Sequence, residues 1–352
     1  MSNHPSGKRK KSFDHSRKPA KIKGEDPSSY LLRILLSSVP YYVSGTILAQ
    51  KLKMSRVGIW SRIDKLRKSG IKIEAYQNLG YRIVKEPNKL NFWLLSARLA
   101  NYSSKLKTLH LHESIDSTNS EAERLLANQN ATPFAVVANR QINGRGRLGR
   151  QWHSPKNGNI YLSIAFRPRV EISRLKTFTL WQGIMICDFL RQQLQSDRIF
   201  VKWPNDLFFK DKKIGGILTE ASIDGDRINS LILGIGLNLN TSLSDFPKEL
   251  KEYCQTLMEI HGRQVRVNEY ASKIIETILM AYEDCLHDKT STYLLEKWKG
   301  VDFLCGKKIK FTHDNSSYTG KAMGIDAEGN LEIKLRNGKR KFLHSGEVQI
   351  QK

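Results

Sequence analysis

The segment 144–152, GRGRLGRQW, combines three glycines, three arginines and a terminal tryptophan within nine residues. Glycine lets the backbone approach a ligand closely and adopt positive φ angles. Arginine supplies a planar, permanently charged group that matches the oxygens of carboxylates and phosphates. The segment therefore predicts a loop that wraps around a small anionic ligand. The alternative, from composition alone, is a basic loop exposed to solvent.

The glycines of this segment also fit the dinucleotide-binding pattern G-x-G-x-x-G, which requires a strand before it and a helix after it. The apolar run 134–138 predicts the strand. However, Pro155 and the turn-forming residues 157–159 follow the segment, and the apolar run 160–166 predicts a second strand. The loop is therefore expected to join two strands, which disfavours a dinucleotide site.

A lysine ends the apolar run 199–201, and the chain continues as WPND. At the end of a buried strand, desolvation makes the charge of Lys202 available to an anion rather than to water. Pro204 ends the hydrogen-bond ladder of the strand. Asn205 and Asp206 then present polar groups at the end of the strand. The pattern predicts that Lys202 faces an anionic ligand.

The residues Asp116, Ser117, Thr118 and Asn119 open a predicted helix that runs through position 126. One interpretation is an ordinary helix cap, in which Ser117 or Thr118 caps the helix and Glu121 completes a capping box with Thr118. The other interpretation is functional. It places the two hydroxyls and the amide at the helix N-terminus, facing a ligand.

Together these blocks resemble the biotin–protein ligases. Five motifs stand in the family's order between about residues 116 and 240, including GGIL at 215–218 and GIGLN at 234–238. Each motif is modest alone, but five in order are specific. The related lipoate ligases and octanoyl transferases share the fold and lack the GRGR loop as it stands here. The resemblance implies a central mixed-sheet catalytic domain, similar to class II synthetases, over residues 89–299.

The resemblance also implies roles for individual residues. It assigns biotin binding to Ser117, Thr118, Asn119, Gln141, Arg145, Gly146, Arg147 and Lys202. Trp152 and Asn238 are the implied ATP contacts, with Trp152 stacking near the adenine. Lys202, beside the biotin carboxylate and the α-phosphate, and Arg147 are the implied catalytic pair. No metal ligand is assigned to the protein itself.

The implied reaction explains why cations are needed. Biotin and ATP give biotinyl-5′-AMP and pyrophosphate, so a carboxylate must attack a phosphate and two anions are forced together. Fixed positive charge stabilises the transition state, and Mg²⁺ is expected to neutralise the departing pyrophosphate. In the second step, a lysine of a biotin carboxyl carrier protein attacks the mixed anhydride. The glycine-rich loop must then exclude water and reopen.

Residues 29–88 predict a winged helix-turn-helix. Three helical segments are followed by the alternating runs 71–75 and 80–84, which predict a hairpin. The segment contains eleven basic and three acidic residues, which favours DNA as a partner. It resembles the N-terminal domain of the bifunctional biotin ligases, which repress biotin genes. A homodimer is suggested because such domains usually read paired half-sites.

The third helix of this domain, which begins after Ser55, is expected to enter the major groove of an operator. We assign its DNA contacts to Ser55, Arg56, Trp60, Arg62 and Lys65. A second interpretation of Trp60 is that it packs against the wing.

The flanking segments differ in character. Residues 1–28 are polar and basic without apolar periodicity, which predicts a disordered basic tail. Residues 300–352 contain four short predicted strands, 308–312, 317–325, 331–335 and 341–343, with turns that include Asp314-Asn315 and Asn337-Gly338. This pattern is similar to the SH3-like β-barrel at the C-terminus of the same ligases.

The composition limits the class of protein. The 352 residues support two or three domains of an α+β fold, and the net charge of +24 favours nucleic acid or acidic protein partners. Four widely spaced cysteines indicate reduced thiols and a cytoplasmic location, and no apolar run is long enough to span a membrane. Two alternatives stay open: a repressor that senses biotin without catalysis, and a lipoate or octanoate ligase.

Overall fold

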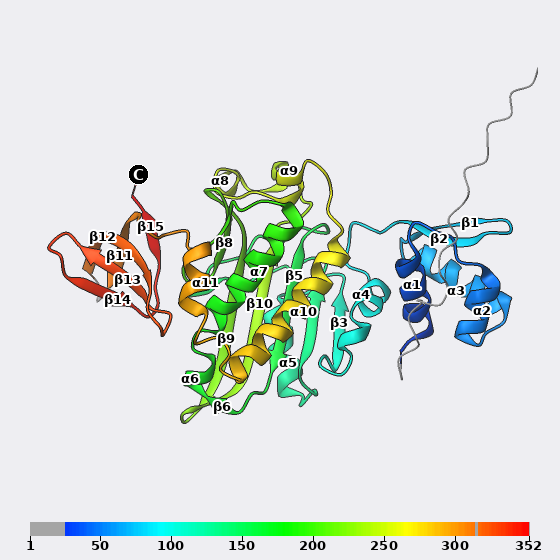
Figure 1. Ribbon diagram of the computed structural model, residues 1–352, viewed down its shortest axis with the longest axis horizontal. Coiled ribbons are helices and arrows are strands. Elements are labelled where there is room, and N and C mark those ends of the chain that lie inside the picture. The colour runs from blue at the N-terminus through cyan, green and yellow to red at the C-terminus, as the bar shows by residue number, and fades with distance from the viewer. Residues whose placement is uncertain (1–24, 314–315, 352) are drawn as a thin grey trace, which may run out of the picture. The chain divides into compact units, whose positions relative to one another are not determined.

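The structure is a computed structural model that describes residues 25–313 and 316–351. The chain divides into two compact units. One contains residues 25–87 together with 96–100, and the other contains 88–95 and the described residues from 101 onward. Figure 1 shows the elements of both. No helix among the described residues is long and apolar enough to cross a membrane.

The first unit begins with helix α1 (Pro27–Ser38), which starts two residues before the expected boundary at residue 29. Asp26 caps the helix by accepting hydrogen bonds from the amides of Ser28 and Ser29. Arg33 on α1 pairs with Glu25 at 2.5 Å, so residues 25–28 belong to the folded domain. The rest of the expected tail, residues 1–24, lies outside the described residues.

Two further helices and a hairpin complete the winged helix-turn-helix. Helix α2 spans Gly45–Leu52, and α3 spans Arg56–Lys68. Helix α3 buries Ile59, Ile63 and Leu66, the stripe expected of an amphipathic helix. Strands β1 (Lys72–Tyr76) and β2 (Gly80–Lys85) pair antiparallel to form the wing. The predicted architecture of this domain is confirmed.

The second unit is built on a mixed eight-stranded sheet. Its main path runs β3-β4-β5-β10-β9-β8-β7, and β6 pairs with β10. The strand bounds are β3 Thr108–His112, β4 Phe134–Ala138, β5 Ile160–Phe166, β6 Val170–Glu171, β7 Ile199–Lys202, β8 Asp206–Phe209, β9 Lys212–Asp224 and β10 Arg227–Leu237. The pair β3–β4 is parallel and the other pairs are antiparallel. Strands β4 and β5 are buried at every residue, because helices cover both faces there.

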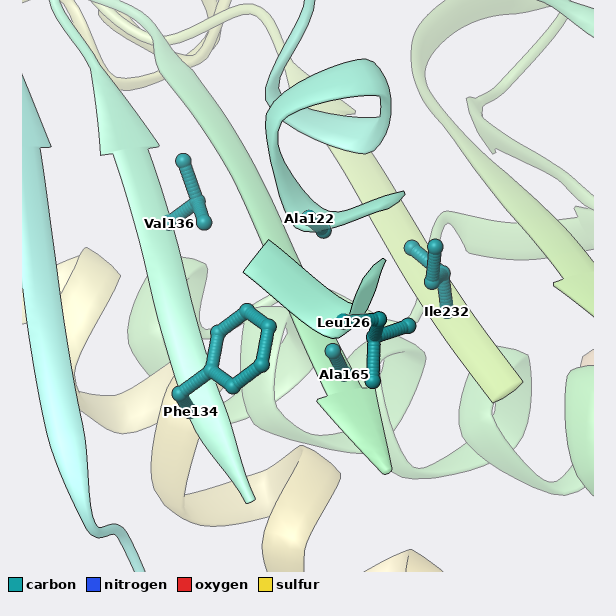
Figure 2. Close-up of a cluster of buried hydrophobic side chains, with 6 residues drawn as sticks. All are labelled: Ala122, Leu126, Phe134, Val136, Ala165 and Ile232. Atoms are coloured by element: carbon teal, nitrogen blue, oxygen red, sulfur yellow. The ribbon is translucent and has the colours of Figure 1, made fainter. Parts of the chain in front are cut away.

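The two faces can be assigned from neighbouring residues of β5, whose side chains point to opposite sides. Ala165 joins a buried cluster with Leu126 of helix α5 (Thr118–Ala127), as Figure 2 shows. Phe166 instead stacks on Tyr282 of α10 (Val267–Leu286), with ring centroids 3.9 Å apart. Helix α7 (Phe178–Leu194) packs beside α10 on that same face. Helix α5 therefore covers one face of the sheet, and α7 and α10 cover the other.

The remaining elements connect these layers. The short α-helices are α4 Phe92–Arg98, α6 Ile172–Leu175, α8 Lys248–Lys251, α9 Leu257–His261 and α11 Leu294–Val301. The 3-10 turns are η2 Ala100–Tyr102, η3 Arg147–Gly149 and η4 Leu243–Asp245. Helix α11 continues through the expected domain boundary at residue 300. Trp298, before the boundary, and Val301, after it, are both buried, which stabilises the helix across this point.

The C-terminal segment forms an antiparallel sheet in the order β14-β13-β12-β11-β15. Its strands are β11 Lys308–His313, β12 Ser316–Ile325, β13 Leu331–Leu335, β14 Arg340–Leu343 and β15 Val348–Ile350. The four predicted strands are present. The fifth, β15, was missed because three residues are too few to show a period of two. The predicted turn at residues 314–315 lies outside the described residues.

Candidate functional site

A cavity of about 400 Å³ brings the predicted ligase residues together. It is lined by all ten of them: Ser117, Thr118, Asn119, Gln141, Arg145, Gly146, Arg147, Trp152, Lys202 and Asn238. These residues come from the start of α5, the loop between β4 and β5, and the ends of β7 and β10. Motifs that lie between positions 117 and 238 therefore meet at one site.

The start of α5 is held by the chain beside it. Helix α5 begins after Ser117, whose side chain makes no capping hydrogen bond. The amide of Thr118 instead donates to Oε1 of Gln141 at 2.8 Å, and the Thr118 hydroxyl lies 3.1 Å from the same oxygen. Glu121 pairs with Arg124 at 2.7 Å. The interpretation of this segment as a capping box is therefore wrong.

Two residues that sequence reasoning missed orient Asn119. The hydroxyl of Ser163 lies 2.5 Å from Oδ1 of Asn119 and 2.7 Å from the hydroxyl of Thr118. The side-chain amide of Asn119 donates to Oε2 of Glu220 at 2.6 Å. Asn119 is buried, so these bonds fix which way its amide points. Ser163 lies in a strand whose sequence carries no local signal of a ligand site, whereas Glu220 follows the GGIL motif of β9 by two residues.

Glycines in the two central strands leave room for these side chains. A Cβ at Gly234 would lie 2.2 Å from Oδ1 of Asn119, and one at Gly236 would lie 2.4 Å from the indole of Trp152. Gly216 pairs with Gly236 across the strands. Three glycines of the GGIL and GIGLN motifs, Gly216, Gly234 and Gly236, thus form the floor of the cavity. Glycine inside a strand is the sequence signal of such a close approach.

The arginine-rich loop folds back on itself. The amide of Gly146 donates to the carbonyl of Arg150 at 2.7 Å, and that of Trp152 donates to the carbonyl of Gly144 at 2.8 Å. At its tip, Leu148 has φ +55° and is 72% exposed. A left-handed leucine is a strained conformation that surrounding contacts must hold. The predicted position of the loop between two strands is confirmed.

The three arginines of the loop have different partners. Arg145 pairs with Glu220 and with Glu123, and Arg150 pairs with Glu347. Arg147 is half-buried and donates to the neutral side-chain oxygen of Asn205 at 3.1 Å. Burial lowers the pKa of Arg147, and the nearby Asp206 opposes that effect. The desolvated charge of Arg147 is therefore available to an anion in the cavity.

Lys202 provides a second cation at the end of β7. Burial lowers the pKa of Lys202, while the charge of Asp206 raises it. Asp206 itself pairs with Lys213 at 2.8 Å. Lys202 is therefore positioned beside the cavity in an environment that favours binding an anion over hydration.

The predicted nucleotide residues lie on the same floor. The ammonium of Lys213 lies 5.2 Å from the ring centroid of Trp152, a cation–π contact. The indole nitrogen of Trp152 is buried and makes no hydrogen bond with the described residues. Asn238 is also buried, and its side chain donates to the carbonyl of Gln255 at 3.4 Å.

The five predicted DNA-contact residues differ in exposure. Ser55 caps α3 by accepting from the amide of Gly58 at 3.1 Å. Arg56 donates to the hydroxyl of Thr46, whereas Arg62 is half-buried and donates to Ser28 and Met54. Trp60 is 58% exposed, which favours the interpretation as a DNA contact over packing against the wing. Lys65 is exposed on the same helix.

Three family descriptions match successive parts of the chain. Residues 28–82 match the HTH domain, 111–238 match the Biotin/lipoate A/B protein ligase family, and 304–350 match the Biotin protein ligase C terminal domain. The three matches follow the order of the domains in the structure.

Whole-chain relatives agree with these matches. The chain is 31% identical over 318 residues to the Bifunctional ligase/repressor BirA of Bacillus subtilis (strain 168), covering 88% of this chain and 94% of that protein. It is 27% identical to the protein of the same name from Escherichia coli (strain K12), covering 88% and 92%. Among solved structures, the biotin protein ligase from Aquifex aeolicus in complex with biotin and ATP is 30% identical, with a TM-score of 0.58, covering 70% of this chain and 99% of that chain.

Proposed function

The chain belongs to the biotin protein ligases that carry an N-terminal helix-turn-helix domain, and from that premise we infer the work of its cavity. It is an ATP-dependent biotin–protein ligase and a biotin-responsive repressor. We propose that it activates biotin as biotinyl-5′-AMP and transfers the biotin to a lysine of a biotin carboxyl carrier protein. The observation that carries this proposal is the meeting of all ten predicted ligase residues around one cavity.

We assign the ring system of biotin to the polar end of this cavity. Ser117, Thr118, Asn119 and Gln141 gather there around the start of α5. The bonds to Ser163 and Glu220 orient Asn119 before a ligand arrives. A pre-oriented set of buried donors and acceptors loses little entropy on binding and discriminates against a ligand that lacks matching groups. Lipoate and octanoate lack the ureido ring of biotin, so this end of the cavity favours biotin.

Lys202 and Arg147 perform the electrostatic part of the first step. An oxygen of the biotin carboxylate attacks the α-phosphorus of ATP, and the bond to the pyrophosphate oxygen breaks. Negative charge develops on the α-phosphate oxygens as this happens. Two half-buried cations act strongly there because little water screens them. No side-chain nucleophile is required.

We place the adenylate end near Trp152 and Asn238. The flat indole lies on the glycine floor and offers a stacking surface for adenine. Mg²⁺ would neutralise charge on the triphosphate, and Asp206, which lines the cavity, would offer it a carboxylate oxygen of the type it prefers. For this to happen, Asp206 would have to leave its present ion pair with Lys213.

The loop at residues 144–152 serves the second step. The amine of the acceptor lysine attacks the carbonyl carbon of the mixed anhydride, an amide forms and AMP leaves. Until the acceptor arrives, the adenylate must be kept from water. A loop anchored at its base and strained at its tip is suited to opening and closing.

We propose that the first unit binds an operator through α3, as a homodimer on paired half-sites. The excess of basic over acidic residues in 29–88 supports an interaction with phosphates. We also propose a cytoplasmic location, supported by four cysteines that are all unpaired.

The test is a direct assay of purified protein with ATP, Mg²⁺ and biotin. Biotinyl-5′-AMP should accumulate, and labelled biotin should pass to a biotin carrier domain. Tight biotin binding without turnover would instead identify a sensor. Turnover of lipoate or octanoate in place of biotin would overturn the assignment of the ring site.

A further inference from the structure

We propose that α3 reads the methyl groups of thymines in the major groove through Val57 and Trp60. The half-site of this protein would then carry thymines opposite these two side chains. The inference rests on the proposed DNA-binding role and specifies the base chemistry that it recognises.

The first observation is the apolar surface on the leading turns of α3. Val57 is 75% exposed and Trp60 is 58% exposed. Residues three apart are neighbours on a helix surface, so Val57 and Trp60 lie next to each other, while Ile59 and Ile63 are buried in the core. An exposed indole beside an exposed valine forms an apolar surface of the kind that marks an interaction site.

The second observation concerns the charged side chains of the same helix. Arg56 donates to Thr46 at 2.6 Å, and Arg62 donates to Ser28 at 3.0 Å, so both guanidinium groups are held against the domain. Further along, Asp64 pairs with Lys68 at 2.8 Å. Within residues 56–61, the exposed side chains are Val57, Trp60 and Ser61, together with Arg56, whose guanidinium group is bonded to Thr46.

The chemistry of the groove identifies the occupant. The N-terminal residues of the second helix of a helix-turn-helix contact base edges. On those edges, the apolar feature is the C5-methyl group of thymine, whereas guanine is read by arginine or lysine forks. The basic excess of residues 29–88 complements the phosphates on either side. Duplex DNA with thymines at the contacted positions matches both the apolar side chains of α3 and the positive charge of the domain.

The experiment removes only the methyl group. A duplex is selected from a random pool with the full-length protein, and each of its thymines is then replaced singly by uracil. Burying one methyl-sized group is worth about 0.8 kcal/mol, so uracil at each contacted thymine should weaken binding about fourfold. Uracil elsewhere in the duplex should leave affinity unchanged.

Variants connect the effect to the side chains. Trp60→Ala should weaken binding to the selected duplex and abolish the uracil effect at the thymine that Trp60 contacts. Ile223→Ala is the matched control, because Ile223 is also exposed, at 54%, but lies on β9. It should preserve both the affinity and the uracil effects. The uracil series on the unaltered protein stands even if a variant folds poorly.

Two results would overturn the inference, and they differ. If the protein bound a specific sequence and no uracil substitution lowered the affinity, recognition of thymine methyl groups would be refuted and the DNA-binding role would stand. Failure to select any sequence from the pool would refute both. The expected result is a loss of affinity confined to two or three adjacent thymines in each half-site, with the effect at the thymine that Trp60 contacts absent in Trp60→Ala.

Discussion

Lys202 is the residue whose charge the proposed adenylation uses most directly. Its ammonium is half-buried beside the cavity, so little water competes for it. We expect Lys202→Ala to lower the rate of biotinyl-5′-AMP formation about 10² to 10³-fold, the usual effect of removing one preorganised charge. The measurement is single-turnover adenylate formation. Lys210→Ala, in the turn between β8 and β9, should leave this rate unchanged because Lys210 is exposed. Full activity in Lys202→Ala would refute the role.

The same group predicts a pH dependence. Because burial lowers the pKa of Lys202 below its ordinary value of 10.5, its charge is lost at a lower pH than that of a solvated lysine. The charged form is the one that acts, so adenylation should decline on the alkaline side before pH 10.5 is reached. In Lys202→Arg, any residual activity should lack this decline, since arginine keeps its proton. An identical alkaline profile in both proteins would assign the titration to another group.

Glu220 is predicted to be a positioning residue for biotin. It accepts from the buried amide of Asn119 and pairs with Arg145 of the loop. We expect Glu220→Gln to raise the KM for biotin about tenfold, because a charged hydrogen bond is worth about 1.5 kcal/mol or more. The value of kcat should change less. Glu123→Gln is the control, since Glu123 contacts Arg145 and leaves Asn119 untouched. If both substitutions raised the KM for biotin equally, Glu220 would act only through its ion pair with Arg145 of the loop and not through Asn119.

At the scale of elements, β9 and β10 show how glycine makes room for a site. A methyl group at Gly236 would collide with the indole of Trp152 at 2.4 Å, so Trp152 would have to move. We expect Gly236→Ala to raise the KM for ATP at least tenfold and to shift the tryptophan fluorescence.

The matched substitution is Gly300→Ala in α11. Apart from the helix's own backbone and the chain neighbours, no atom of the described residues lies within 4 Å of the position a methyl group would take there. It should leave KM unchanged and raise the free energy of unfolding by about 0.5 to 1 kcal/mol, as alanine does inside a helix. An unchanged KM in Gly236→Ala would show that Trp152 is not part of the nucleotide site.

Elements with a local signal were predictable from the sequence, and long-range partners were not. The loop at 144–152 and the lysine that ends β7 show their residue types within a few positions. The acceptor that holds the start of α5 is Gln141, 23 residues along the chain, so a local rule for capping boxes selected Glu121 instead. Glu347 joins Arg150 across 197 residues, and no periodicity reports such a pairing. Ser163 was hidden for a similar reason, inside a strand buried on both faces.

At the scale of the whole molecule, the two proposed activities should respond differently to salt. DNA binding displaces counterions from phosphates, so affinity falls steeply with ionic strength. For about five phosphate contacts, we expect a loss on the order of 10²-fold or more between 50 and 200 mM salt. Adenylation uses half-buried cations, which salt screens weakly. Measuring the DNA affinity and the rate of adenylation in one series of salt concentrations checks this difference. A parallel decline would indicate general destabilisation of the protein.

The amide of Thr118 donates to Gln141, a residue that follows the end of strand β4 in the chain, rather than to a cap of its own helix. Helix ends normally fray first, and their amides exchange with deuterium quickly. This end cannot fray until the segment carrying Gln141 separates from it. Its amide should therefore exchange only when the sheet opens, about as slowly as those of β4 and β5. The ring site would then be fully assembled in every molecule before any ligand is present.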